Sequence, residues 1–409
     1  MTSNAEQGSS AGDLVVAKGS FAAMGGAERD LMRNLPALAQ RFSVSVATLH
    51  PVPELELLCS GLGVPLISSD EAWEMPTDAL STVLDSGMDS AVEAWAGCSG
   101  LAEALAACDA LHLVSGDGSL ALLKHVPDSV AVPLHLLEPH RGLHEDVLHR
   151  EIDGSPKRSL GLTSTLLSRA RRRDIEAIRG LTDRPCSAIS GNSSYTVARI
   201  GEVYGVEAGV LLPSVVSDEF PAKAGSDESS ETPDIAGPYA VSVGRASWAK
   251  GTWETVSMLS GSGVSLAHVG GGAGEDLVRL TQHAESCGVG LWVAPRLSSP
   301  EMAALMRGAR AVVSMAHGEP FGLTPVEAVS VGTPALMVDE GGFRDTVIDG
   351  VNGRLLPRDD LGAWHSALEQ AADGGNRTAW AESGRARIAE MDLSPDTHCH
   401  RLESILGCL

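Results

Sequence analysis

Aromatic residues, paired cysteines and long apolar runs are scarce in this sequence. Phe, Tyr and Trp make up only 4 % of the 409 residues, so the cores must be built from small aliphatic side chains. The seven cysteines are scattered without a CxxC pair, which indicates reduced thiols rather than a zinc site or a disulfide framework. No apolar run approaches the roughly 18 residues of a membrane span, and no secretory signal is visible. A cytoplasmic protein without stable membrane association is predicted.

Positive charge is also in short supply. Lys and Arg total 30 against 53 Asp and Glu, which gives a formal net charge of -23. Most of the surface would therefore repel a nucleic-acid backbone, so no nucleic-acid partner is expected and any anion site must be local. Hydrophobic residues reach 43 %, enough for sizeable cores, and the length predicts at least two domains.

Short β-branched runs alternate with longer Ala- and Leu-rich stretches of helical period. Most of these runs are continuously apolar, as expected for strands covered by helices on both faces. Strand followed by helix, repeated in two series, predicts an α/β protein with two doubly wound, Rossmann-like domains that face an interdomain cleft. The predicted strands are 14–17, 44–49, 64–68, 110–115, 132–137 and 187–190, then 239–243, 265–269, 291–294, 311–315, 334–338 and 354–356.

An acidic stretch rich in Ser and Pro, without periodicity, separates the two series. We place the linker there, at residues 222–238. The preceding domain covers 13–221 after a flexible leader of residues 1–12, and the following domain covers 239–390. A C-terminal helix is expected in 391–409, with a return to the N-terminal domain left open.

The strongest local pattern is a pair of glutamates directly after the predicted strand 311–315. Glu319 lies in a Pro-Phe-Gly loop, where its carboxylate can accept hydrogen bonds from hydroxyl groups in a cleft. Glu327 follows eight positions later, near the start of a helix. A purely structural alternative exists for it, because Thr324 as N-cap and Pro325 as first helical residue would let Glu327 complete a capping box.

These residues resemble a known family, the retaining GT-B glycosyltransferases of family 4, which carry a Glu-x7-Glu element at this place. The resemblance spans most of the chain, and the order of the blocks makes it specific. It implies a GT-B fold with an acceptor-binding N-terminal domain and a nucleotide-sugar-binding C-terminal domain. The matching blocks are Gly25 to Arg29, Val243 to Arg245 with Lys250 and Gly251, Val269 to Gly272, Glu319 to Glu327, Glu327 to Pro334, and Gly341 to Gly353.

Two cations and two glycines match the family's diphosphate site. Arg245 follows a strand and offers a planar fork to two phosphate oxygens, and Lys250 offers a point charge five residues on. Gly25 and Gly26 have no Cβ and precede a helix, so a phosphate could approach closely. Alternatively, Arg245 and Lys250 are solvated surface cations beside a domain boundary.

The resemblance also implies roles for residues around the glutamates. Glu327 would hold the nucleoside ribose hydroxyls, and Glu319 would hold the hydroxyls of the transferred sugar. Arg245, Lys250 and Glu319 are then the catalytic residues. Further donor-binding positions implied in the same way are the backbone of Phe321, Gly322 and Leu323, and Arg296 beside the base.

The N-terminal domain departs from the family at one position. The histidine that usually contacts the transferred sugar aligns with Leu137. His135, His140 and Arg141 are the nearby candidates for the acceptor or sugar side. Each histidine could equally be an ordinary loop or core residue.

The predicted function is retaining, metal-independent transfer of a hexosyl-type sugar from a nucleotide-diphosphate donor, with a GDP-sugar favoured, to a small-molecule acceptor. HExxH and DxD arrangements are missing from the sequence, so no metal and no cofactor are expected. The chain further resembles the lincosamide-pathway transferases that move a GDP-linked octose onto a low-molecular-weight thiol, which implies a role in antibiotic or thiol-linked biosynthesis.

Two other functions remain open from the sequence. A nucleotide-sugar epimerase can use the same two-domain architecture, and a non-catalytic protein could keep the nucleotide site. Homo-oligomerisation is also left open.

Overall fold

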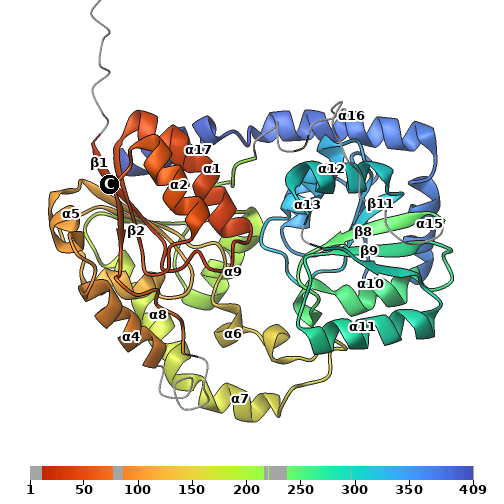
Figure 1. The fold of residues 1–409 in the computed structure, drawn as a ribbon, viewed down its shortest axis with the longest axis horizontal. Coiled ribbons are helices and arrows are strands. Elements are labelled where there is room, and N and C mark those ends of the chain that lie inside the picture. The colour runs from red at the N-terminus through yellow and green to blue at the C-terminus, as the bar shows by residue number, and fades with distance from the viewer. Residues whose placement is uncertain (1–11, 77–85, 216–219, 221–236, 296, 409) are drawn as a thin grey trace, which may run out of the picture.

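The computed structural model describes residues 12–76, 86–215, 220, 237–295 and 297–408. Nearly all of the predicted leader and linker lies outside these ranges. The described chain forms two lobes, an N-terminal one drawn in red to yellow-green and a C-terminal one in green to blue (Figure 1).

The N-terminal lobe is built on a seven-stranded parallel sheet. Its strand order, β3-β2-β1-β4-β5-β6-β7, turns outward in both directions from β1, as in doubly wound folds. The strands are β1 (Asp13–Ala17), β2 (Ser43–Thr48), β3 (Leu66–Ser68), β4 (Ala110–Val114), β5 (Val132–His135), β6 (Ser187–Gly191) and β7 (Gly209–Val210).

The C-terminal lobe repeats this plan with six parallel strands in the order β10-β9-β8-β11-β12-β13. Its first strand again lies inside the sheet, between β9 and β11. The strands are β8 (Tyr239–Val243), β9 (Ser265–Val269), β10 (Leu291–Val293), β11 (Ala311–Ser314), β12 (Ala335–Val338) and β13 (Arg354–Leu356).

Helices cover both faces of each sheet (Figure 1). In the N-terminal lobe they are α1 (Gly26–Arg41), α2 (Pro53–Leu62), α4 (Ser86–Ala96), α5 (Leu101–Ala107), α6 (Arg141–His144), α7 (Leu160–Leu166), α8 (Ser168–Thr182) and α9 (Ser194–Tyr204), with short 3-10 helices η1 (Ser119–Lys124) and η2 (Val147–His149). In the C-terminal lobe they are η4 (Trp248–Lys250), α10 (Thr252–Leu259), α11 (Gly274–Cys287), α12 (Ser299–Gly308), α13 (Leu323–Ser330), α14 (Phe343–Thr346), α15 (Leu361–Gln370) and α16 (Gly374–Met391). The last helix, α17 (Pro395–Leu406), lies on the N-terminal lobe.

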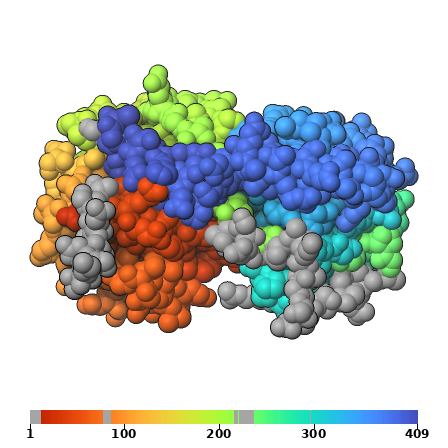
Figure 2. All heavy atoms as spheres, turned by 90° about the horizontal axis from the view of Figure 1, so that it is seen from above, coloured from red at the N-terminus to blue at the C-terminus, as the bar shows by residue number. Residues whose placement is uncertain are grey.

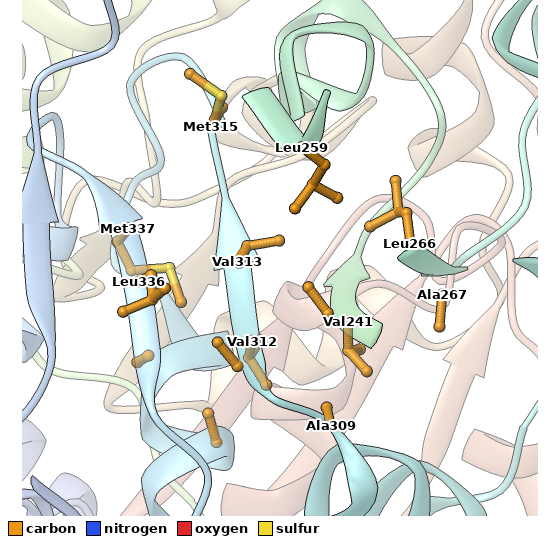
Figure 3. Close-up of a cluster of buried hydrophobic side chains, with 14 of the residues drawn as sticks. Val241, Leu259, Leu266, Ala267, Ala309, Val312, Val313, Met315, Leu336 and Met337 are labelled. Carbon is orange, nitrogen blue, oxygen red and sulfur yellow. The ribbon is translucent and has the colours of Figure 1, made fainter. Parts of the chain in front are cut away.

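Small aliphatic side chains fill the core of each sheet, as the shortage of aromatics predicts. In the C-terminal lobe Val241, Val312, Val313 and Leu336 belong to this core (Figure 3). Val312 and Val313 are neighbours on β11 and therefore point to opposite faces of the sheet, and both faces are covered by helices. All four are fully or almost fully buried. Burial on both faces explains why these strands are apolar without alternation.

The last two helices run back across the molecule as one ridge that spans both lobes (Figure 2). α16 packs on α13 in the C-terminal lobe, and α17 packs on α1. Cys399 and Leu402 of α17 are fully buried in the core of the N-terminal lobe. The chain end therefore completes the first lobe.

The structure confirms the α/β architecture and all twelve predicted strands, with one strand missed and one helix start placed wrongly. β7 has only two residues, too few to show a pattern. α13 begins at Leu323 behind Gly322, which has a φ of 86° and no side-chain cap. Glu327 therefore lies beyond the first turn, and the capping-box alternative for it is wrong.

Candidate functional site

The loops that follow β5, β8 and β11 meet between the lobes and form a cluster of four charged side chains. Lys250 Nζ donates a hydrogen bond to Glu319 Oε2 at 2.7 Å. From the other lobe, Arg141 Nε lies 3.8 Å from Glu138 Oε2. Arg141 Nη2 also donates to the main-chain oxygen of His317 at 2.6 Å, which joins the lobes. We call Glu138, Arg141, Lys250 and Glu319 the central charge cluster.

The cluster shifts the titration of two of its members. Glu319 raises the pKa of Lys250, against the opposing effect of burial. Protein encloses Glu138 on most sides, although 41 % of its side chain still meets solvent. This loss of hydration raises the pKa of Glu138 to about 7, and Glu319 adds to the rise while Arg141 opposes it. Such shifts are typical of sites that bind or transform polar ligands.

A cavity of about 920 Å³ lies between α1 and the C-terminal lobe; we call it the α1–α13 cavity. Glu327 of α13 contributes a carboxylate to its wall, and Val243 at the end of β8 contributes an apolar surface. Arg29 and Arg33 line it from the N-terminal lobe. Its size and mixed lining suit a drug-sized or cofactor-sized molecule.

A second cavity, of about 580 Å³, lies between η2 and η4; we call it the η2–η4 cavity. The N-terminal lobe supplies Arg150 and Lys157 to its wall, and the C-terminal lobe supplies Arg245. Asp276 at the start of α11 is the acidic residue in the same wall. An acidic protein thus concentrates cations locally, as its net charge requires of any anion site.

Direct hydrogen bonds hold the lobes together beside the cluster. Ser194 donates through its main-chain nitrogen to Asp345 Oδ2 at 2.7 Å and through its hydroxyl to Oδ1 at 2.5 Å. The hydroxyl of Ser193 donates to the main-chain oxygen of Pro320. Since Pro320 follows Glu319, the N-terminal end of α9 helps to position the glutamate loop.

The predicted glycine loop lies at this junction too. A Cβ on Gly26 would stand 3.7 Å from Leu323 Cδ1, so the start of α1 approaches the start of α13. The main-chain nitrogen of Gly25 donates to Glu28 Oε2 at 2.7 Å. Glu28 in turn pairs with the buried Lys18 at 3.2 Å. Sequence reasoning missed this buried pair beneath the loop, because one carboxylate in a first helical turn looks like an ordinary helix feature.

The other predicted donor-side residues are not all brought together. Phe321 is buried, and Gly322 is the N-cap residue of α13, which begins at Leu323. This loop therefore places main-chain groups next to Glu319 along the chain. Arg245 is exposed and lines the η2–η4 cavity, without contact to the Lys250–Glu319 pair. Arg296 lies outside the described residues, although its neighbour Leu297 lines the α1–α13 cavity.

The two candidate histidines are not members of the central charge cluster. His135 is only 2 % exposed, and its Nδ1 lies 3.1 Å from the hydroxyl of Ser190 inside the lobe. Burial holds the pKa of His135 well below its usual value. His140 is exposed and caps α6 without a side-chain hydrogen bond. His135 thus lies in the core and His140 at the start of α6, whereas Arg141 joins the cluster. A role of either histidine towards the sugar or the acceptor stays a prediction.

Glu138 and a stack behind Lys250 are the parts of the site that sequence reasoning missed. The rings of Trp248 and His317 stack with centroids 4.7 Å apart. His317 Nε2 lies 2.7 Å from Glu254 Oε2, and Arg358 Nη1 donates to the same oxygen at 3.1 Å. Glu138, Trp248 and His317 are far apart in the sequence. The one sequence signal that could have indicated them is that each lies in a segment directly after a strand.

Within the described ranges, no three His, Cys, Asp or Glu side chains lie close enough together to hold a metal ion. Metal independence is not tested by this finding and stays a prediction. Over the same ranges, every helix is too short or too polar to cross a membrane. All seven cysteines are free thiols.

Residues 227–387 match the family described as "Glycosyl transferases group 1". This match spans most of the C-terminal lobe and less than half of the chain. A D-inositol 3-phosphate glycosyltransferase of Xylanimonas cellulosilytica is 32 % identical to this protein over 191 residues, or 43 % of this chain and 46 % of the relative. One from Gordonia bronchialis is 33 % identical over 150 residues, or 35 % of this chain and 32 % of that protein. The alignments thus span less than half of these relatives.

Solved structures extend the likeness in fold to both lobes. Anabaena HepE, crystallised with UDP and glucose, superposes with a TM-score of 0.67 at 16 % identity and covers 97 % of this chain and 100 % of its own. Sucrose-phosphate synthase of Thermosynechococcus elongatus gives a TM-score of 0.70 at 17 % identity, with 96 % and 98 % covered. The superpositions show that the fold is shared, and it is the predicted GT-B fold.

Proposed function

We propose that this protein is a retaining glycosyltransferase that moves a hexosyl-type sugar from a nucleotide diphosphate, with GDP favoured, to a small-molecule acceptor. The observation that carries the proposal is the Lys250–Glu319 pair at the meeting of the two lobes, and a separate cavity lined by Glu327 supports it. The match to the group 1 glycosyltransferase family and the glycosyltransferase activity of the similar proteins support it.

The donor nucleotide would occupy the α1–α13 cavity. Glu327 in its wall accepts hydrogen bonds from ribose hydroxyls, and Val243 with Leu297 provides an apolar surface for the base. The diphosphate then lies towards Lys250 and the N-terminal end of α1, which begins at Gly26. Glu319, released from part of its contact with Lys250, accepts hydrogen bonds from the sugar.

Transfer in this proposal needs no enzymic nucleophile. The bond between the anomeric carbon and the β-phosphate oxygen breaks with its electron pair leaving on the diphosphate. The acceptor attacks from the same face and forms the new bond, and its proton passes to the departing phosphate oxygen. Lys250 and Arg245 stabilise the leaving negative charge, so the proposal includes no metal.

The acceptor would lie on the side of the η2–η4 cavity. A volume of about 580 Å³ suits a small molecule, and Arg150 and Lys157 suit an acidic group on it. By the resemblance to lincosamide-pathway transferases, we propose a soluble acceptor from antibiotic or thiol-linked biosynthesis in the cytoplasm.

A thermal-shift screen with GDP, UDP and dTDP tests the donor site. At 100 times its dissociation constant the cognate nucleotide adds about 2.7 kcal/mol of stability, and Glu327→Gln should lose most of this gain. Glu176→Gln, an exposed change on α8, is the control. The absence of a shift with all three nucleotides would contradict the nucleotide site.

The chemistry is tested by incubating each nucleotide sugar with and without an acceptor panel. We expect an α-linked product from an α-linked donor. It should form only when an acceptor is present, and it should still form when EDTA removes metal ions. Conversion of the donor without acceptor would indicate an epimerase. Binding of the donor without any conversion would indicate a non-catalytic protein.

A further inference from the structure

A hairpin of the N-terminal lobe docks on the C-terminal lobe next to the loop that carries Lys250. It comprises residues 150–156, closed by an antiparallel bridge between Arg150 and Pro156. The segment between α6 and α7 can be followed towards α11 in Figure 1. Ile152 at its tip is only 2 % exposed and belongs to the hydrophobic core of the C-terminal lobe. The N-terminal lobe thus contributes a core residue to its neighbour.

Two ion pairs fix the hairpin to α11. Arg279 Nη2 lies 2.6 Å from Asp153 Oδ2, and Arg279 Nη1 lies 3.2 Å from Glu151 Oε2. Asp153 also accepts hydrogen bonds from the main-chain nitrogen and hydroxyl of Ser155, which shape the turn. One arginine therefore holds both acidic residues that flank the buried Ile152.

The turn of the hairpin presses on Trp248. Gly154 has a φ of 83°, and a Cβ there would stand 2.6 to 2.9 Å from three ring atoms of Trp248. The tryptophan ring therefore lies directly on the glycine backbone. A Cβ at position 154 would occupy the same space as the ring, so this contact requires glycine. The same ring stacks on His317.

Trp248 connects the hairpin to the central charge cluster. It begins η4, the single turn that ends at Lys250, and the main-chain nitrogen of His317 donates to the oxygen of Ala249 at 2.9 Å. His317 itself lies two residues before Glu319. Both partners of the Lys250–Glu319 pair are thus attached to elements that Trp248 touches.

We propose that Trp248 is a positioning residue for the diphosphate, held by the hairpin of the opposite lobe. This inference rests on the proposed function. The hairpin backbone at Gly154 and the His317 ring fix the indole, and the indole fixes the turn that directs Lys250. Trp248 itself contacts no reacting atom in this proposal. Docking of the hairpin therefore sets phosphate affinity, while the nucleoside end in the α1–α13 cavity is bound independently.

Calorimetric titration with inorganic pyrophosphate and, separately, with guanosine, uridine and thymidine tests this. Trp248→Ala should weaken pyrophosphate binding about tenfold, the loss expected when a charged hydrogen bond is misplaced. Trp248→Phe, which keeps a flat ring, should restore it to within about twofold. Nucleoside affinity should stay unchanged in both variants.

Gly154→Ala repeats the test from the other lobe, because this residue lines neither cavity. It should weaken pyrophosphate binding like Trp248→Ala, whereas Gly263→Ala should not. Gly263 has a similar φ of 68° but open space around it, so it controls for backbone strain alone. If Trp248→Ala fails to fold, Gly154→Ala and Arg279→Ala decide the matter.

The outcomes separate the two proposals. Equal pyrophosphate affinity in the parent and in the hairpin variants would overturn the role of Trp248 and leave the proposed function standing. Parallel loss of pyrophosphate and nucleoside binding would also overturn it, since it would show a general structural effect. A parent protein that binds neither pyrophosphate nor any nucleoside would contradict the proposed function as well.

Discussion

Lys250 and Glu319 neutralise each other across 2.7 Å, and each is partly accessible to solvent, 37 % and 21 % of the side chain. A phosphate that binds Lys250 must compete with Glu319 for the same ammonium group. In the proposed function, the pair would balance affinity for phosphate against a position ready for the sugar hydroxyls.

Glu319→Gln should separate these two roles. Lys250 loses the partner that raises its pKa but stays positively charged at neutral pH, so nucleoside diphosphate binding should be unchanged or tighter. Sugar transfer should fall by about two orders of magnitude, since one preorganised charged contact to the reacting sugar is lost. Calorimetry and initial rates measure the two effects. Weaker nucleotide binding together with full turnover would contradict the assignment.

Three histidines lie together inside the N-terminal lobe. The ring centroids of His112 and His135 are 6.3 Å apart, and those of His135 and His398 are 6.1 Å apart. Within the described residues, His112 Nδ1 has no hydrogen-bond partner. Burial, together with the nearby His398, lowers the pKa of His112 to about 3. This histidine therefore stays neutral in the folded protein at pH values where it is protonated in the unfolded chain.

Folding stability should fall on acidification as a result. Because the folded-state pKa of His112 is below the unfolded value, its contribution is lost as the pH falls from about 6.5 towards 3. At pH 5 the loss from this residue is about 2 kcal/mol. Urea unfolding between pH 7 and 5 measures it, with His112→Leu expected to show a shallower pH dependence. The exposed His400→Gln should keep the parent slope.

At the scale of single elements, one turn decides where η4 and β11 lie. Gly251 has a φ of 62° and both ends η4 and caps α10. A Cβ at this position would stand 1.9 Å from the main-chain oxygen of Met315. The approach of η4 to the end of β11 therefore requires glycine for space as well as for conformation.

Gly251→Ala and Gly288→Ala separate these two requirements. Gly288 caps α11 with a φ of 66° and has open space around the missing Cβ, so alanine there should cost about 1 kcal/mol of backbone strain. Gly251→Ala should cost several kcal/mol and displace Lys250, with loss of nucleotide binding. Chemical unfolding and calorimetry test both. Equal costs would show that the contact with Met315 is easily relieved.

At the scale of the whole molecule, the site exists only while the lobes stay together. α17 completes the N-terminal lobe, the 150–156 hairpin enters the C-terminal one, and Ser194 binds Asp345 between them. Since the α1–α13 cavity has walls from both lobes, we expect affinity for the proposed nucleotide to depend on the fraction of molecules in which the lobes stay together.

Asp345→Ala should lower that fraction. It removes two hydrogen bonds to Ser194, so nucleoside diphosphate affinity should fall about three- to tenfold while each lobe keeps its fold. Asp339→Ala removes an ion pair with Arg344 inside one lobe and is the matched control. Calorimetry, with X-ray scattering for the separation of the lobes, provides the readout. Identical affinity and dimensions in both variants would show that this contact does not hold the lobes.

Much of the fold and the list of candidate residues could be predicted from the sequence alone. Continuous apolar runs marked the strands, because burial on both faces leaves no alternation. Local motifs marked Lys250, Glu319 and Glu327, because a loop at the end of a strand and the start of a helix is specified by neighbouring residues.

The tertiary structure alone decided which of these residues meet. Burial of His135 depends on the packing inside the N-terminal lobe. The lining of the η2–η4 cavity by Arg245 and the approach of Glu138 and Arg141 to Lys250 depend on how one lobe faces the other. The contact of Gly154 with Trp248 likewise joins residues 94 positions apart. Sequence patterns predict structure among residues that are close in the chain. The contacts between the lobes instead result from the packing of two separately formed sheets.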